Sequence, residues 1–110
     1  MPAVLTSATG PLMRRTILAG FIFSTATLAA AQDQAAIEAG AQVYEQHCAS
    51  CHGENLRSAG AMPDLRDLPN DRTRFDTMVL EGRNQMPSWQ GIVSPQELDQ
   101  LWAYVRSRAR

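Results

Sequence analysis

The heptapeptide "HCASCHG", residues 47–53, holds both cysteines and both histidines of this 110-residue chain. Thiolates and imidazoles bind metals, and two thiols can also cycle through a disulfide. Three kinds of chemistry therefore come into question: a redox dithiol, part of a metal site, or a covalent tether for a cofactor. The rest of the sequence has to separate them.

The dithiol and zinc interpretations lack the context that they need. A thioredoxin-type Cys-x-x-Cys follows a strand in a βαβ unit, and no segment here alternates in hydrophobicity as a strand would. A closed tetrahedral zinc site needs a second pair of ligands, but no Cys or His lies outside residues 47–52. A structural disulfide between Cys48 and Cys51 remains an alternative, although it would close a very short loop.

Cys48, Cys51 and His52 spell C-x-x-C-H, the pattern of covalent c-type haem attachment. Residues three apart on a helix share a face, so both thiols can form thioethers with one porphyrin. His52, one residue further on, can then bind the iron. We therefore expect one covalently bound haem c.

The N-terminal segment has the order of a secretory signal. An arginine pair at residues 14–15 precedes an uncharged, largely apolar stretch, residues 16–31, which ends in three alanines. That stretch is shorter than the about 20 strongly apolar residues that span a bilayer. We interpret residues 1–31 as an N-terminal extension and signal peptide and residues 32–110 as a periplasmic domain, with membrane contact only if the signal is uncleaved.

The composition of residues 32–110 excludes one class of partner and predicts a cofactor. Eight arginines, no lysine and eleven acidic residues give a net charge of −3, which is not a nucleic-acid-binding surface. A domain of 79 residues is close to the size at which an apolar core alone supplies only a few kcal/mol. A bound haem would complete that core.

Apolar residues at three- and four-residue spacing predict two longer helices. The first covers residues 34–48, with Asp33 as its expected N-cap. The last covers residues 95–108, where Ser94 and Glu97 are placed to form a capping box ahead of a proline at the first helical position.

A shorter helix is expected over residues 74–81, between an N-cap at Thr73 and a stop at Gly82. Two long connections, residues 53–71 and 82–93, are rich in Gly, Pro and Asn. Loops of this length in a small domain need something to wrap around. We therefore predict an all-α domain: three to four short helices and long loops around one haem.

The second axial ligand has four candidates. His47 adjoins the attachment motif and cannot reach the opposite face of the ring, and Met78 falls on the apolar face of the short helix. Met62 and Met86 both lie in loops before a proline. Met86 follows His52 by 34 residues, which lets a helix cross the haem edge before the chain returns, so we favour Met86.

These features resemble class I cytochrome c, the monohaem c-type cytochromes, and the resemblance implies the small cytochrome c fold for the all-α domain. Gly40 and Tyr44 ahead of the motif, and Leu101 and Tyr104 in "LWAYV", resemble the family's N- and C-terminal helices, where the glycine allows the two helices to cross closely. Within the family the chain looks most like the small cytochromes and cytochrome domains associated with periplasmic quinoprotein dehydrogenases.

Two loop segments carry the resemblance to the site. "MPDL" resembles the family's segment after the attachment motif, which implies that the Pro63 carbonyl accepts a hydrogen bond from the His52 ring and that Leu65 lines the haem. "NQMPSW" resembles the family's distal methionine loop, which implies that Met86 is the sixth iron ligand.

Other residues are expected around the haem. Trp89, three residues after Met86, should pack near the distal face. Arg66 is a candidate partner for a haem propionate, with a solvated surface arginine as the alternative. Residues 59–62 and Ala49 are expected to rim the exposed haem edge where a redox partner docks.

We therefore expect a periplasmic one-electron carrier that is not an enzyme on its own, because iron bound on both faces leaves no open position. Its donor would be a dehydrogenase, with a quinoprotein dehydrogenase as the candidate, and its acceptor an oxidase or another cytochrome. Two alternatives stay open: a ligand-binding haem sensor or enzyme with a labile sixth position, and a fixed cytochrome subunit of a larger redox complex.

Overall fold

The computed structural model describes residues 3–4, 10–11, 25–58 and 60–110. In these ranges the chain forms helices and two isolated β-bridges but no strand, which confirms the predicted all-α class. The elements are α1 (Thr25–His47), α2 (Ala49–His52), the 3₁₀ turns η1 (Glu54–Leu56) and η2 (Leu65–Asp67), α3 (Arg72–Glu81) and α4 (Pro95–Ser107).

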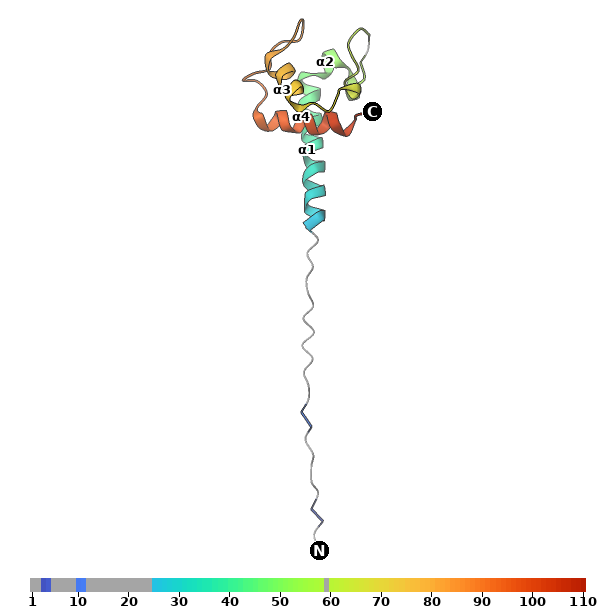
Figure 1. The fold of residues 1–110 in the computed structure, drawn as a ribbon, viewed down its shortest axis with the longest axis vertical. Coiled ribbons are helices and arrows are strands. Elements are labelled where there is room, and N and C mark those ends of the chain that lie inside the picture. Colours follow the sequence, from blue (N-terminus) through green and yellow to red (C-terminus); the bar gives the residue numbers. More distant parts are fainter. Residues whose placement is uncertain (1–2, 5–9, 12–24, 59) are drawn as a thin grey trace.

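Helix α4 crosses α1 near the C-terminal end of α1 (Figure 1). A Cβ atom on Gly40 would stand 1.9 Å from the carbonyl oxygen of Gln100 and 2.9 Å from Cβ of Tyr104. No side chain fits in that space, so glycine is required where the backbones meet. The rings of Tyr44 and Tyr104 pack beside this point, with centroids 5.5 Å apart. The close crossing expected from the resemblance is confirmed.

The core lies where α1 and α4 cross and extends to α3 and the loops. Its buried side chains come from α1, η1, α3, the loop before α4, and α4 itself. They are Val43, Tyr44, Leu56, Val79, Val93, Leu98, Leu101, Tyr104 and Val105. The buried residues of α4 recur at the three- and four-residue spacing from which that helix was predicted.

The start of α1 differs from the prediction. The helix begins at Thr25, so Asp33 lies inside it, exposed, and is not the N-cap. The alanines before Asp33 have the highest helix propensity of any residue type, which lets the helix extend back through them. Of the predicted signal peptide, residues 16–24 lie outside the described residues and residues 25–31 belong to α1. Among the described helices, none has the length and apolar character needed to cross a bilayer.

The start of α3 also differs, because Asp71 rather than Thr73 is its N-cap. The Asp71 side chain accepts a hydrogen bond from the backbone N–H of Arg74 at 3.0 Å. Capping needs a side-chain acceptor within reach of the N3 amide, and Asp71 supplies it two residues earlier than expected. The predicted stop at Gly82 is confirmed, with φ of 74°.

The N-terminus of α4 is as predicted. The Glu97 N–H donates to Ser94 Oγ at 3.2 Å, and the Ser94 N–H donates to Glu97 Oε2 at 2.8 Å. This capping box and the proline at the first helical position fix where α4 begins.

Candidate functional site

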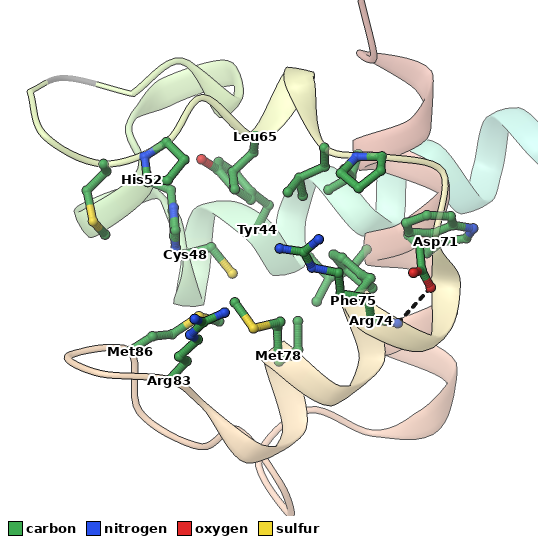
Figure 2. Close-up of a pocket in the computed structure, with 18 of the residues that line it drawn as sticks. Tyr44, Cys48, His52, Leu65, Asp71, Arg74, Phe75, Met78, Arg83 and Met86 are labelled. Atoms are coloured by element: carbon green, nitrogen blue, oxygen red, sulfur yellow. Dashed lines mark hydrogen bonds between the residues drawn. The ribbon is translucent and has the colours of Figure 1, made fainter.

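A cavity of about 580 Å³ lies beside the α1–α4 crossing, enclosed by α2, α3, α4 and the two long loops. Figure 2 shows His52 and Met86 on its walls. The lining side chains are mostly apolar or aromatic: Tyr44, Cys48, His52, Met62, Pro63, Leu65, Leu68, Pro69, Asp71, Arg74, Phe75, Met78, Val79, Arg83, Asn84, Gln85, Met86, Leu101, Trp102 and Val105. The volume is in the range of about 300–1,000 Å³ typical of cofactor pockets.

The short helix α2 carries His52 to the cavity. The chain leaves α1 with a hydrogen bond from Cys48 N–H to the carbonyl of Tyr44 at 2.8 Å, and His52 N–H donates to the carbonyl of Cys48 at 2.9 Å. The Tyr44 hydroxyl then donates to the carbonyl of Gly53 at 2.6 Å. Tyr44 therefore ties the segment after the histidine back to α1 and fixes where α2 lies.

His52 has properties expected of a candidate metal ligand. Burial lowers the pKa of this imidazole, so the neutral ring, which is the form that binds metals, is favoured. Its Nδ1 atom is buried and has no hydrogen-bond partner in the described part of the chain. An unpartnered buried nitrogen is costly, so the described residues do not satisfy this ring.

The hydrogen bond expected between His52 and Pro63 is not formed in this structure, since Nδ1 has no partner. Both residues nevertheless line the cavity. Pro63 is therefore at the site, as the resemblance implies, but it does not make the expected hydrogen bond.

Cys48 and Cys51 are free thiols on consecutive turns of backbone, with Cys51 N–H donating to the carbonyl of Cys48 at 3.2 Å. Cys48 is half-buried and lines the cavity, whereas Cys51 is exposed. Burial and the neighbouring Cys51 raise the pKa of the Cys48 thiol to about 11. Cys48 is therefore a protonated thiol at neutral pH.

The structural disulfide and the zinc site gain no support from the geometry. Cys48 and Cys51 do not form a disulfide. In the described ranges no group of three or more His, Cys, Asp or Glu side chains is placed to hold a metal ion. Both thiols are therefore free to attach a cofactor.

Met86 is held by the backbone of its own loop. The N–H of Arg83 donates to the carbonyl of Met86, and the N–H of Met86 donates to the carbonyl of Arg83, both at 3.0 Å. Gly82 precedes this bridge with positive φ, and a Cβ there would stand 2.5 Å from the carbonyl oxygen of Met86. Glycine at residue 82 is therefore what lets the loop fold back over the cavity.

The same loop is attached to α3 after the methionine. The N–H of Trp89 donates to the carbonyl of Val79 at 3.0 Å, and the Ser88 hydroxyl donates to the carbonyl of Leu80. The position of the methionine loop thus depends on α3 as well as on its own turn.

Met78 and Met62 also line the cavity. Met78 comes from α3 and points inward near Met86 in Figure 2, so it is a wall residue rather than only core. Met62 lies at the rim, with 37% of its surface exposed. The structure thus places three thioethers around the cavity.

Of the other predicted site residues, Pro63 and Leu65 line the cavity but Arg66 and Trp89 do not. The Arg66 guanidinium binds the Asp64 carboxylate through two hydrogen bonds, of 2.9 and 2.6 Å. The ring of Trp89 packs on His47, with centroids 5.1 Å apart. The roles expected for Arg66 and Trp89 therefore find no support here.

Three residues that were not predicted at the site line the cavity instead. Trp102 and Phe75 form part of the wall and pack on each other, with ring centroids 5.1 Å apart. Arg74 lies on α3 one turn before Met78 and lines the same cavity. Residues four apart on a helix share a face. If Met78 had been predicted to face the cavity, its spacing from Arg74 would have placed Arg74 there as well.

The donor set and the shape of the wall fit a c-type haem. The half-buried imidazole of His52 and the thioether of Met86 both line the apolar cavity, and these are two of the axial ligands that haem iron takes in proteins. Two free thiols lie in the same short segment as the imidazole, where they could attach a cofactor. This combination of an all-helical fold and a C-x-x-C-H cavity defines a c-type cytochrome domain.

Comparison with known families agrees with that class. A family model described as "Cytochrome C oxidase, cbb3-type, subunit III" matches residues 35–105. The chain therefore belongs to the cytochrome c family, whose members carry haem c.

Individual relatives are of two kinds. Cytochrome c-555 of Methylococcus capsulatus is 32% identical over 104 residues, which cover 88% of this chain and 84% of that protein. Cytochrome c6 of a Nostoc species is 32% identical over 95 residues, covering 81% of each chain. Both relatives are named as cytochromes, and this chain covers most of the length of each.

The second kind is much larger. Quinohemoprotein alcohol dehydrogenase ADH-IIG of Pseudomonas putida is 39% identical over 84 residues, which cover 74% of this chain but 12% of that protein. The chain thus spans about an eighth of the length of this relative.

Proposed function

We propose that this protein is a periplasmic one-electron carrier with a single haem c, attached through Cys48 and Cys51 and ligated by His52 and Met86. The observation that carries the proposal is the apolar cavity with His52 and Met86 on its walls and Cys48 beside His52. The haem supplies reversible one-electron chemistry when bound. The residues of the chain bind and orient the haem and keep water away from it.

Each group of residues has a role in that proposal. Helix α2 and Tyr44 orient His52, and the bridge between Arg83 and Met86 presents the thioether. The apolar wall excludes water, which disfavours the more highly charged ferric state, and a thioether ligand acts in the same direction. The chain is thus suited to accept and hold an electron without binding a substrate.

The donor and acceptor are proposed from the relatives. Similarity to quinohemoprotein alcohol dehydrogenases favours a quinoprotein dehydrogenase as donor, with an oxidase or another cytochrome as acceptor. Met62, exposed at the cavity rim, remains a candidate docking contact. Its neighbour Ala59 in the predicted docking segment lies outside the described residues. Interfaces between redox partners are small and transient, so a short apolar rim is sufficient.

The first test is the visible spectrum of the purified, reduced protein before and after addition of carbon monoxide. A haem-stained denaturing gel first establishes covalent attachment. We expect no spectral change with carbon monoxide, because both axial positions are held. A prompt shift would contradict the carrier proposal and favour the ligand-binding sensor or enzyme with a labile sixth position.

One observation favours a second candidate, a fixed subunit of a larger redox complex. The matching family model takes its description from an oxidase subunit. Native electrophoresis of gently lysed cells, stained for haem, separates the two. Haem at the size of the single chain supports the carrier, whereas co-migration with a large complex supports the subunit.

A further inference from the structure

We propose that Arg74 binds a carboxylate of the haem, one of its propionates, at the end of the cavity away from Cys48. This inference rests on the proposed function and adds to it the residue that recognises the acidic end of the cofactor. It replaces the expectation that Arg66 has this role.

The charges on the cavity wall complement an anion. Three formally charged side chains line it: Asp71, Arg74 and Arg83. Asp71 is already engaged as the N-cap of α3, where it accepts from the backbone N–H of Arg74. An otherwise apolar cavity therefore carries an excess of positive charge, which matches an apolar ligand with acidic groups at one edge.

The position of Arg74 on α3 is not explained by helix stability. A cation in the first turn of a helix interacts unfavourably with the helix dipole, and the first turn of α3 after its N-cap Asp71 contains no acidic residue that could pair with it. Its neighbour Arg72 is paired with Asp76 and Asp99, each at 2.6 Å. Arg74 makes no ion pair with any described residue, so its guanidinium is available to a ligand.

The position of Arg74 on α3 selects one end of the cavity. In Figure 2, the Arg74 backbone lies beside Asp71 and Phe75, across the cavity from Cys48 and His52, and its side chain extends from there into the cavity. A haem carries its two vinyl groups, which react with the cysteines, and its two propionates at different edges of the ring. A ring tethered at Cys48 therefore directs its propionates toward the Arg74 end.

Arg83 is the other basic residue on the wall, but it lies in the methionine loop. Its backbone exchanges two hydrogen bonds with Met86, and its side chain lies next to Met86 in Figure 2. That position is beside the axial ligand rather than at the far end. Arginine binds a carboxylate bidentately, and Arg74 is the residue placed to do so.

The test compares haem-loaded wild type with Arg74→Gln and Arg74→Lys. Arg57→Gln is the matched control, since Arg57 is exposed and does not line the cavity. Arg83→Gln tests the competing residue. Two readouts are used: the propionate bending band in the resonance Raman spectrum, and the reduction potential measured as a function of pH.

We expect Arg74→Gln to shift the propionate band and to raise the pKa of one propionate by about one to three units, which makes the potential pH-dependent near neutrality. Arg74→Lys should restore part of the wild-type behaviour and Arg57→Gln all of it. A purely structural role would change folding without moving either readout.

Two results would overturn the inference: Arg74→Gln and Arg74→Lys behaving like Arg57→Gln, or the shift occurring with Arg83→Gln instead. In either case a wild-type protein with attached, carbon-monoxide-insensitive haem leaves the proposed function standing. A wild type without covalent haem removes both.

Discussion

Replacing Gly40 by alanine tests whether the α1–α4 crossing determines the whole site. The new Cβ would stand 1.9 Å from a backbone oxygen of Gln100, whereas real contacts of this kind stay at 3.0 Å or more. The two helices would have to separate by about 1.1 Å, the difference between these distances. Because α4 contributes Leu101 and Trp102 to the cavity wall, that movement reaches the haem site.

The magnitude follows from three opposing contributions. Alanine gains about 1 kcal/mol over glycine in helix propensity. Overpacking costs about 3 kcal/mol here, the upper end of the usual range, because the obstacle is backbone and cannot rotate away. Loosening the Tyr44–Tyr104 ring contact costs about another 1 kcal/mol. The net loss of about 3 kcal/mol lowers Tm by about 12–24 °C in a domain of this size.

Thermal unfolding of the haem-loaded proteins, followed by circular dichroism in the far-ultraviolet and Soret regions, measures this loss. The control is Ala35→Gly at an exposed position of the same helix, which reports helix propensity alone and should cost about 1 kcal/mol. A Gly40→Ala protein with unchanged or higher Tm would refute the argument, since propensity would then outweigh the clash.

Three further predictions concern single contacts. Met86→Ala should let carbon monoxide bind the reduced haem and lower the reduction potential, because the thioether that favours ferrous iron is gone. Tyr44→Phe should lower the free energy of unfolding by about 1 kcal/mol through loss of the hydrogen bond to Gly53. Burial raises the pKa of Tyr44 above its ordinary value of 10.0. The stability that the Tyr44 hydroxyl contributes is therefore present below pH 10 and lost as the pH rises further. The Tyr44→Phe variant has no such group and should lose less stability than wild type above pH 10. Ser94→Ala should cost about 1 kcal/mol by removing the cap of α4.

Each of these predictions has a result that contradicts it. Met62→Ala, at the exposed rim, is the control for Met86→Ala, and equal carbon monoxide binding by both would remove the role of Met86. For Tyr44→Phe, urea unfolding measures the free energy of unfolding at pH 8 and at pH 10.5. This free energy should fall less between the two pH values than it does in wild type. An equal fall in both proteins would contradict the raised pKa of Tyr44. An unchanged Tm of Ser94→Ala would mean that the capping box adds nothing to α4.

Features that depend on neighbouring residues could be predicted from the sequence. Ser94 and Glu97 are three residues apart, so the capping box needs only the helix that it begins. The cysteines and His52 share one short segment, so their proximity is guaranteed by the chain. Gly40 was identified through a family resemblance, and the 1.9 Å approach gives the physical reason for it.

Features that depend on a choice between partners could not be predicted. Arg66 was expected at the haem, but Asp64, two residues away, binds its guanidinium first. Asp71 and Thr73 both qualify as helix caps, and only the path of the preceding loop decides between them. Arg74 reaches the cavity because α3 packs with that face inward, which is a tertiary fact that local spacing does not contain.

The closed turn around Met86 has a consequence for the rate of electron transfer. Two backbone hydrogen bonds between Arg83 and Met86, and a third from Trp89 to α3, hold the methionine backbone in place in the described structure without help from a metal. If Met86 binds the iron as proposed, a backbone held in this way would let the ligand move little when the iron changes oxidation state, which would keep the inner-sphere reorganisation energy low. Gly82 allows that turn, so a larger residue there would be expected to raise the reorganisation energy and slow electron transfer.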